Sequence, residues 1–377
     1  MVALFHLPVI GHIYPGSLDT MRLINNSWLF VDFFFVLSGF IITHSLSEGI
    51  TSPRGLIAFA IRRFGRLWPT HFVIIVLMIA YQFSKAPPGP LLVMFNSKTY
   101  AVNDFLISLS YFMTFLHSLP GFFQLGIGAF VDINPPSWSI SVEYWIYLLF
   151  GIILLYAKHF KNALLSILII ASSLMLLLID EQIGSSLEYG ILRCAYGFFV
   201  GHMVYLCYSA NSFDLNHWRL GATIIEGLVV LGSAMFVILT GPVPQSLFAP
   251  AIFGLMVYVF AFEAGGLSRL MMVKPIRYLG TLSYTIYICH ALVALALADG
   301  LKLIQQWMGV TYSFQREMYW EMVTVISFPS TVAANFNVLC YIFITIGFAA
   351  LLSHWVEIPC RDWVNRFAKA YAGKPQS

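Results

Sequence analysis

Long runs of apolar residues, separated by short polar segments, follow one another along almost the whole chain. A membrane-spanning helix needs about 20 mostly apolar residues, because each backbone N–H and C=O must be hydrogen-bonded within the hydrocarbon layer. We therefore expect an all-α, multi-pass integral membrane bundle, with residues 1–377 forming a single domain. The pattern predicts ten spanning helices, near residues 1–14, 28–46, 64–83, 137–157, 163–180, 187–208, 218–240, 245–262, 278–298 and 335–357.

Two apolar stretches depart from this pattern. Residues 105–118 are too few for a span and include Ser108 and His117, so this stretch is predicted to be interfacial or re-entrant. The first run, residues 1–14, precedes a turn-forming Pro-Gly-Ser segment and has neither the basic start nor the cleavage motif of a signal peptide. We expect this run to be the later part of a spanning helix whose start is missing from the chain.

Composition agrees with a membrane protein. Hydrophobic residues make up 59% of the chain and charged residues only 10%, whereas soluble domains carry about 25% charged residues. Five cysteines in 377 residues exclude a disulfide-rich secreted scaffold, and a net charge of +3 argues against a nucleic-acid partner. The cysteines also lack the spacing of metal ligands, so we expect neither a metal nor a permanently bound cofactor.

The basic residues predict the orientation of the bundle, because cytoplasmic loops carry an excess of Lys and Arg. The two sets of alternate loops hold fourteen and five basic residues, and Arg193 lies inside a span, which accounts for all 20. Both termini are therefore predicted to be cytoplasmic. The larger set is Arg54, Arg62, Arg63, Arg66, Lys158, Lys161, Arg219, Arg269, Lys274, Arg277, Arg361, Arg366, Lys369 and Lys374, and the smaller set is Arg22, Lys85, Lys98, Lys302 and Arg316.

Among the ionisable side chains of the predicted spans, ten stand as candidate functional residues. Such groups are costly in hydrocarbon and usually face a bundle interior or a cavity, so each is a candidate functional residue. A lone histidine in a membrane is nevertheless more often a hydrogen-bonding partner between helices than a catalyst. The ten are His6, Asp32, His44, His71, Glu143, Arg193, His202, Glu226, His290 and His354.

Three of these groups have unusual neighbours. Asp32 precedes an aromatic run and the Ser38-Gly39 pair, which allows helix backbones to approach closely. Glu143 lies about two turns inside a helix that begins after two prolines, and His290 lies near the middle of a span.

A cluster of arginines marks a fourth segment. Arg62, Arg63 and Arg66 precede Trp68-Pro69, and Arg62 and Arg66 share a helix face because they are four positions apart. The positive-inside bias explains the cluster as an anchor. A functional interpretation places these cations at a helix N-terminus, where a phosphorylated donor could dock from the cytosol. Both interpretations can hold together.

Together the four segments resemble the membrane-bound acyltransferase family 3. These multi-pass proteins transfer acyl groups, commonly acetyl, from acyl-CoA to hydroxyls of cell-envelope saccharides and other acceptors. The similarity keeps the family order and covers nearly the whole chain. It is carried by His6, Asp32 to Phe40, Arg62 to Pro69, Ser137 to Tyr147, Gly280 to His290, and Ser353 to Arg361.

The resemblance implies an acyl-CoA-dependent O-acyltransferase of the plasma (inner) membrane. Acyl-CoA would be its co-substrate, a saccharide or lipid-linked glycan its acceptor, and membrane lipid its surroundings. Transfer from a thioester to a hydroxyl needs a base for the hydroxyl proton, a donor for the developing oxyanion and an anion site for the CoA phosphates. His6 is the candidate base, on the resemblance and because imidazole accepts a proton near neutral pH. His12 is the less favoured substitute, about 120° away if one helix holds both.

Other candidate residues have open roles. Glu143 is expected either to orient a catalytic histidine or to pair with a buried cation such as Arg193. Asp32 and His290 are each expected to be either a catalytic group or part of the scaffold.

The resemblance adds Ser38 and Gly39 to the arginines of the donor site and Tyr284 to the candidates. The serines of the Ser137–Ser141 segment are predicted to line helix contacts and not to act as nucleophiles, because no base is fixed beside them by their spacing.

The chain departs from the family pattern in three places. An Arg eleven positions before His6 would fall before Met1, and Ile41 to His44 stand where the family usually has a basic residue. Many relatives also have an extracytoplasmic hydrolase-like domain after the last helix, which we expect to be missing here. A truncated start and a divergent or inactive member both explain the first departure.

Two other classes of function remain open at this stage. A transporter or flippase would use the intramembrane charges as a proton or substrate path, although we find no inverted repeat. A non-catalytic membrane scaffold is favoured only by the missing Arg.

Overall fold

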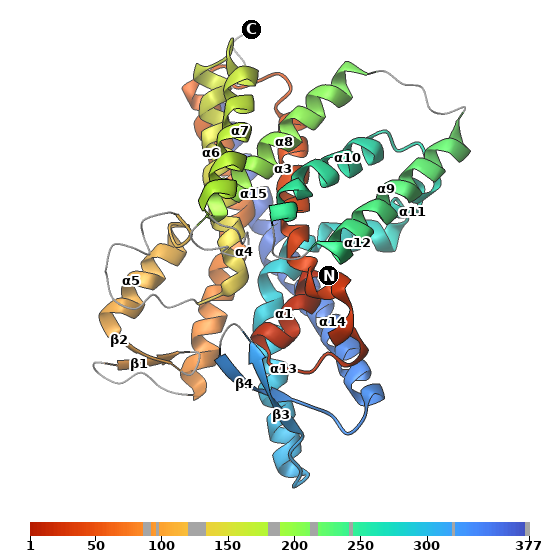
Figure 1. Ribbon diagram of the computed structural model, residues 1–377. Coiled ribbons are helices and arrows are strands. Elements are labelled where there is room, and N and C mark those ends of the chain that lie inside the picture. Colours follow the sequence, from red (N-terminus) through yellow and green to blue (C-terminus); the bar gives the residue numbers. More distant parts are fainter. Residues whose placement is uncertain are drawn as a thin grey trace.

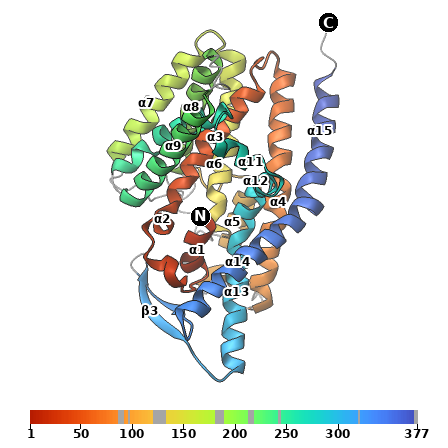
Figure 2. The ribbon, with the colours of Figure 1, turned by 90° about the vertical axis from the view of Figure 1, so that its right-hand side faces the viewer.

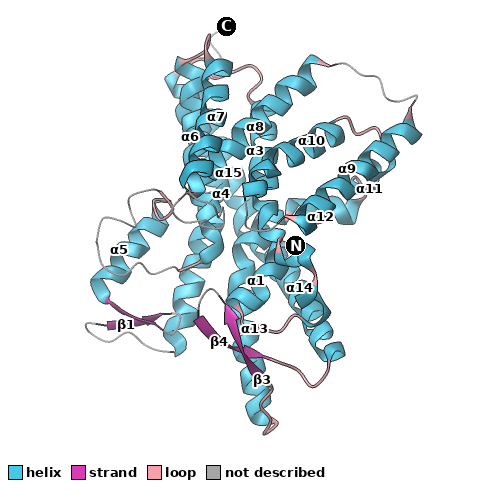
Figure 3. Cartoon of the chain, in the orientation of Figure 1, coloured by secondary structure: helices cyan, strands magenta, loops and turns pink. Residues whose placement is uncertain are grey.

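The protein is a bundle of long helices with two small β-hairpins at one end, as the ribbon in Figure 1 and the cartoon in Figure 3 show. The computed structural model describes residues 1–85, 92–95, 98–119, 133–179, 189–211, 218–240, 244–318 and 321–373. The predicted span residues 180 and 187–188, and the basic Lys374, lie outside the described residues.

Fifteen α-helices and four strands are present in the described part of the chain. The strands pair as antiparallel hairpins, β1 (Leu92–Phe95) with β2 (Lys98–Ala101), and β3 (Ser313–Met318) with β4 (Glu321–Ile326). The helices are α1 (Val2–Ile10), α2 (Arg22–Asn25), α3 (Phe30–Ser45), α4 (Pro53–Lys85), α5 (Val102–Met113), α6 (Trp138–Tyr156), α7 (Lys161–Ile179), α8 (Gly190–Ala210), α9 (Arg219–Leu239), α10 (Ala249–Ala261), α11 (Gly266–Met271), α12 (Lys274–Thr281), α13 (Ser283–Trp307), α14 (Thr331–Leu352) and α15 (Ile358–Ala372).

The prediction of an all-α, multi-pass membrane protein is confirmed. Among the described residues, nine helical segments are long and apolar enough to cross a membrane, and they coincide with nine of the ten predicted spans. The tenth prediction corresponds to α1, which has nine residues. The two hairpins were not predicted.

Several predicted boundaries were wrong, and one of them changes the chemistry. Helix α4 begins at Pro53, well before the predicted start near 64. Arg62, Arg63 and Arg66 therefore lie inside a helix, with Arg62 about 13 Å from its start at 1.5 Å per residue. The helix dipole acts only over the first turn. It therefore does not contribute to anion binding at this cluster, which has to rest on the arginine charges themselves.

The last helices are also rearranged relative to the prediction. The span predicted at 278–298 begins at Ser283, after the separate short helix α12. Helices α14 and α15 form one long rod with a π-helical turn, Ser353–Glu357, between them. Pro359 is the second residue after this turn and cannot donate a backbone hydrogen bond, which accounts for the interrupted α-helical pairing.

Helices α3 and α8 pack with their backbones almost in contact. A Cβ atom on Gly39 would lie 1.9 Å from the carbonyl oxygen of Phe198, and one on Gly201 would lie 2.0 Å from that of Val36. No residue larger than glycine fits at these two positions without moving a helix. The close approach expected from Ser38-Gly39 is therefore confirmed.

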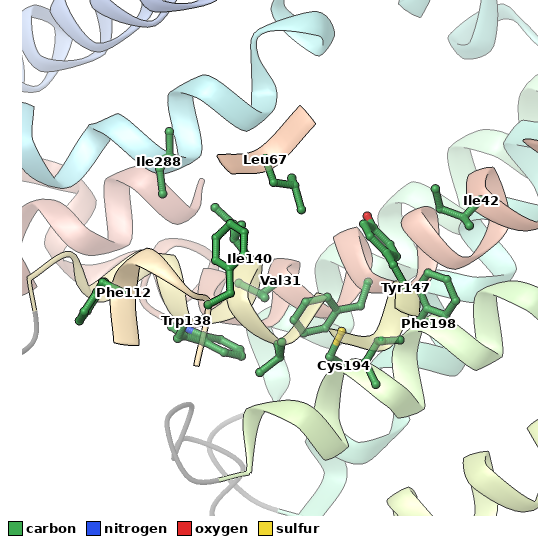
Figure 4. Packing of buried hydrophobic residues seen from close by; sticks show 14 of the residues in the cluster. Val31, Ile42, Leu67, Phe112, Trp138, Ile140, Tyr147, Cys194, Phe198 and Ile288 are labelled. Carbon is green, nitrogen blue, oxygen red and sulfur yellow. The ribbon is translucent and has the colours of Figure 1, made fainter. Parts of the chain in front are cut away.

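The main hydrophobic core lies where α3, α4, α6, α8 and α13 meet. Figure 4 shows Ile140 and Tyr147 of α6 among side chains of these helices, with Leu67, Phe198 and Ile288 among them. Polar groups that lie in this region have to be paired within the protein, because neither water nor lipid can solvate them.

Helix α5 has 12 residues, and its end packs against α4 and α6. The interfacial or re-entrant placement of residues 105–118 stays a prediction. The last turn of α5 is held by ring N–H groups of three side chains from the neighbouring helices α4 and α6. Trp68 Nε1 lies 2.9 Å from the Met113 carbonyl, His71 Nε2 lies 3.0 Å from that of Phe112, and Trp145 Nε1 lies 2.8 Å from that of Phe115. The donors satisfy carbonyls that a helix C-terminus leaves unpaired.

Helix α1 ends at Ile10, so the helical spacing expected between His6 and His12 was wrong. His12 lies beyond the helix with a positive φ of 50°, and its carbonyl accepts the Ile326 N–H at 2.8 Å. This contact ties the end of α1 to strand β4.

The two hairpins lie at the end of the bundle opposite the C-terminus, as Figures 1 and 2 show. This arrangement agrees with the predicted alternation, in which the loops near 84–136 and 299–334 share one side and the basic tail lies on the other.

We predict that the end of the bundle carrying Arg54 is cytoplasmic and that the end carrying Lys302 is extracytoplasmic, because of the basic asymmetry. Both side chains are exposed. In a variant without the five native cysteines, Arg54→Cys should react with an impermeant maleimide only from the cytoplasmic side, and Lys302→Cys only from the outside. The reverse labelling would contradict the predicted orientation.

Candidate active site

Two histidines from opposite ends of the sequence meet inside the bundle. His6 of α1 and His290 of α13 have ring centroids 4.9 Å apart, and His6 Nδ1 lies 2.9 Å from His290 Nε2. His290 is completely buried, whereas His6 is half-buried. The sequence singled out both residues but had no signal for their contact.

The partners of this pair assign its protons. His290 Nδ1 lies 2.6 Å from the backbone carbonyl of Tyr287, which can only accept, so Nδ1 carries the hydrogen. In the neutral ring, His290 Nε2 is then an acceptor, and His6 Nδ1–H donates to it. His6 Nε2 keeps its lone pair and is the basic nitrogen of the pair.

A stripe of polar residues on α6 continues from this region. Ser139, Glu143 and Tyr147 are spaced four apart and therefore share one helix face. The Ser139 hydroxyl donates to the Tyr287 hydroxyl at 2.8 Å, which joins the stripe to the helix that carries His290.

Glu143 forms its hydrogen bonds with two hydroxyls. Its Oε1 accepts from Ser38 of α3 and from Tyr147 one turn further along α6. Neither expectation for Glu143, orienting a histidine or pairing with Arg193, is realised in the contacts of the described residues. Ser38 was expected near the donor site, and its observed role is to donate to this carboxylate.

Arg63 is the arginine of the cluster that turns inward. Its guanidinium carbon lies 5.8 Å from the ring centroid of Phe59 and 6.0 Å from that of Tyr147, and its buried Nε has no hydrogen-bond partner. Arg66 is exposed, and Arg62 is half-buried. Arg62 and Arg66 share a helix face, which suggested the site from the sequence. Arg63, the member of the cluster that turns inward, does not lie on that face.

Asp32 and Arg193 form a closed, buried ion pair between α3 and α8. Arg193 Nε lies 2.8 Å from Oδ1 of Asp32, and Nη2 lies 2.7 Å from Oδ2. The guanidinium also lies over the rings of Trp28 and Trp138, at 5.0 and 5.6 Å, and Nη2 donates to the Trp28 carbonyl at 3.1 Å. Both carboxylate oxygens are thus already bonded to Arg193.

Two further candidates take part in helix contacts. The Tyr284 hydroxyl donates to the Leu67 carbonyl, two residues before Pro69 in α4. Beside it, Thr285 donates at 2.5 Å to the buried Glu357 of the π-helical turn. Glu357 was not singled out from the sequence, because it is the last residue of the span predicted at 335–357 and nothing there indicates that it faces α13.

Glu226 has a purely structural environment. Its carboxylate accepts the backbone N–H groups of Gly265, Leu267 and Ser268 at 3.0, 3.0 and 3.1 Å, and the Ser268 hydroxyl. It therefore caps the start of α11 and has no capacity left for substrate.

A second pair of buried histidines lies near the end of α5. The rings of His71 and His117 are parallel with centroids 6.0 Å apart, and His117 Nε2 lies 3.1 Å from the Ser137 hydroxyl. That hydroxyl is also within 2.7 Å of the Asn134 carbonyl. Burial and the neighbouring His71 lower the pKa of His117 to about 3, so its ring is neutral. Sequence spacing had not placed any histidine beside these serines.

Comparison with known proteins supports an acyltransferase. Residues 1–354 match the family described as the acyltransferase domain. Among curated proteins, peptidoglycan O-acetyltransferase OatA of Listeria monocytogenes serovar 1/2a is 26% identical over 311 residues, which cover 74% of this chain and 49% of that protein. The chain thus spans about half the length of this relative. No solved structure matches the chain.

We predict that Asp32→Ala lowers the free energy of unfolding by about 3–5 kcal/mol, because it leaves Arg193 charged and unpaired in the interior. Unfolding in detergent, followed by circular dichroism, would measure this. The double variant Asp32→Leu, Arg193→Met should recover most of the loss, because it removes both charges. Wild-type stability in the single variant would contradict a structural ion pair.

Proposed function

Because this chain belongs to the acyltransferase family, we propose that it transfers an acyl group, most simply acetyl, from acyl-CoA to a hydroxyl of a cell-envelope saccharide or lipid-linked glycan. The name of the Listeria relative, a peptidoglycan O-acetyltransferase, supports this acceptor class and the acetyl group. The acyl-CoA donor is proposed on the arginine cluster. We place the protein in the plasma membrane, where envelope precursors are exposed.

The observation that carries the proposal is the His6–His290 pair. Acyl transfer to a hydroxyl requires a base at the moment the oxygen attacks, and His6 Nε2 has the free lone pair for this role. In our mechanism, His6 takes the hydroxyl proton while the acceptor oxygen attacks the thioester carbon. The carbon–sulfur bond then breaks, and the imidazolium returns the proton to the departing thiolate, which leaves as free CoA thiol.

The donor site is proposed at the opposite end of the α6 polar stripe. Arg63 supplies a half-buried cation with a buried, unpaired Nε, and Arg62 and Arg66 lie on the same helix at the predicted cytoplasmic mouth. Phosphate groups would satisfy these cations by charge-assisted hydrogen bonds. Gly39 contributes to the donor site by keeping α3 close to α8. Ser38 contributes by donating a hydrogen bond to Glu143.

Glu143 and Asp32 have different proposed roles. Glu143 is bonded to two hydroxyls and interacts electrostatically with Arg66 and Arg63, so its proposed role is to orient the donor end of the site. Asp32 is a positioning residue that fixes α3 against α8 through Arg193. Tyr284 holds α4 next to the arginine cluster through the Leu67 carbonyl.

Activity is tested with the purified full chain in detergent or nanodiscs. Acyl-CoA with a labelled acetyl group should label a peptidoglycan fragment or lipid-linked glycan, and the same protein in sealed vesicles should not move the unmodified acceptor. Transport without labelling would favour the transporter or flippase alternative, and neither activity would favour a scaffold.

We predict that His6→Ala lowers kcat about 10² to 10⁴-fold, because general-base catalysis by a positioned group contributes about this much. Donor binding and thermal stability should change little. The control is His12→Asn, since asparagine tolerates the positive φ at this position and the side chain lies outside α1. Full activity in His6→Ala at equal expression would exclude His6 as the base.

We predict that Arg63→Ala and Arg66→Ala each raise KM for acyl-CoA about tenfold or more and leave KM for the acceptor unchanged. Loss of one charge-assisted phosphate contact costs about 1.5–3 kcal/mol, and 1.4 kcal/mol corresponds to a factor of ten. Arg54→Ala is the matched control, because Arg54 is exposed on the same helix outside the cluster. An equal change in KM for acyl-CoA in all three variants would show that the cluster acts only as a membrane anchor.

A further inference from the structure

His290 occupies a position from which it can control His6 without touching substrate. It is completely buried, its Nδ1 is bonded to the Tyr287 carbonyl at 2.6 Å, and its Nε2 is bonded to His6 at 2.9 Å. Both ring nitrogens are therefore used within the protein. The residue has no free atom for proton transfer to a substrate.

The direction of these hydrogen bonds follows from the carbonyl of Tyr287. A carbonyl oxygen cannot donate, so a neutral His290 has to present its other nitrogen, Nε2, as an acceptor. His6 can satisfy this acceptor only with a hydrogen on Nδ1. Through one intervening ring, the Tyr287 carbonyl of α13 thus favours the Nδ1–H tautomer of His6 on α1, beside a backbone hydrogen bond between His6 and Val2.

We propose that His290 is a positioning residue that fixes His6 as the Nδ1–H tautomer, so that the basic Nε2 lone pair is available to the acceptor hydroxyl. This inference rests on the proposed function for its catalytic meaning. The tautomer itself is a property of the folded protein and can be measured without activity.

The arrangement also stabilises the imidazolium form of His6 that arises during the reaction. When His6 takes a proton on Nε2, it becomes an imidazolium whose Nδ1–H still donates to His290. The contact between the two rings therefore persists from the neutral state to the charged state, and neither side chain has to turn. Tyr341 fixes the same region of α1 and α13, since its hydroxyl lies 3.0 Å from the Ala3 carbonyl and 3.3 Å from that of His290.

Three substitutions separate the contributions of the two nitrogens of His290. Gln has an amide oxygen as many bonds from Cα as Nε2, so His290→Gln retains an acceptor for His6. Asn reaches only as far as Nδ1, so His290→Asn retains a group near the Tyr287 carbonyl and removes the acceptor. His290→Leu removes both.

The expected result is that His290→Gln keeps kcat within a few-fold of wild type, whereas His290→Asn and His290→Leu lower kcat about 10 to 100-fold with little change in either KM. Loss of a group that orients a metal-bound histidine costs about 10 to 100-fold in activity, and we expect a similar range for a group that orients a catalytic histidine. Histidine nitrogen NMR of the full chain in nanodiscs, with the His6 signal assigned from the His6→Ala spectrum, should show Nδ1–H in wild type and His290→Gln. The Asn variant should lose this preference.

His202 provides the matched control, because it is also a buried histidine bonded to a neighbouring helix, at 3.0 Å from the Thr43 hydroxyl. His202→Gln and His202→Asn should leave the His6 tautomer unchanged. Equal kcat for His290→Gln and His290→Asn, or an Nε2–H tautomer of His6 in wild type, would overturn the inference. Retained activity in His6→Ala would instead refute the proposed base, whatever the tautomer measurement shows.

Discussion

The close contact of α3 with α8 is the constraint on which the rest of the interior depends. Glycines at 39 and 201 bring the two backbones within van der Waals distance, and the Asp32–Arg193 pair locks their axial position. A bidentate pair has a fixed geometry, so it sets the register of α3 as well as its distance from α8. This placement of α3 brings the Ser38 hydroxyl to Glu143 on α6. The donor end of the proposed site therefore depends on the position of α3.

The polar groups of the bundle divide into those that are fully bonded and those that keep one free position. Glu226 has all its oxygens committed to the start of α11, and Asp32 has both committed to Arg193. In contrast, Arg63 retains an unpaired Nε, and His6 retains a lone pair on Nε2. Free hydrogen-bonding capacity is costly in an apolar interior. Arg63 and His6 share it with other buried side chains, His71 and His117 among them, so the proposed chemistry is what singles these two out.

Hydrophobic pattern was enough to predict the class of fold, because the spacing of apolar runs follows directly from the thickness of a bilayer. It was not enough for the ends of helices, as α4 shows by continuing eleven residues before the predicted span at 64. Helix α4 packs against α15, with Val364 beside Gly65, and the hydrophobic pattern gives no sign of this tertiary contact. His6, His290 and Glu143 were found by their cost in hydrocarbon, and Arg63 was found by the clustering of arginines. Their partners Tyr147 and Tyr287 were missed because a tyrosine carries no such signal.

In this protein the group that orients the proposed base His6 is a second histidine, whereas many hydrolytic sites use a carboxylate for this purpose. The choice is consistent with the electrostatics of this interior. A carboxylate beside His6 would add another acid to an interior that already buries Asp32, Glu226 and Glu357, and without a cation it would be costly to ionise. A neutral imidazole provides the same directional acceptor without net charge. It stabilises a developing imidazolium less than a carboxylate does, so the arrangement suits an acyl donor that is already activated. A thioester meets that condition, which links the chemistry of the His6–His290 pair to the proposed use of acyl-CoA at the arginine end of the bundle.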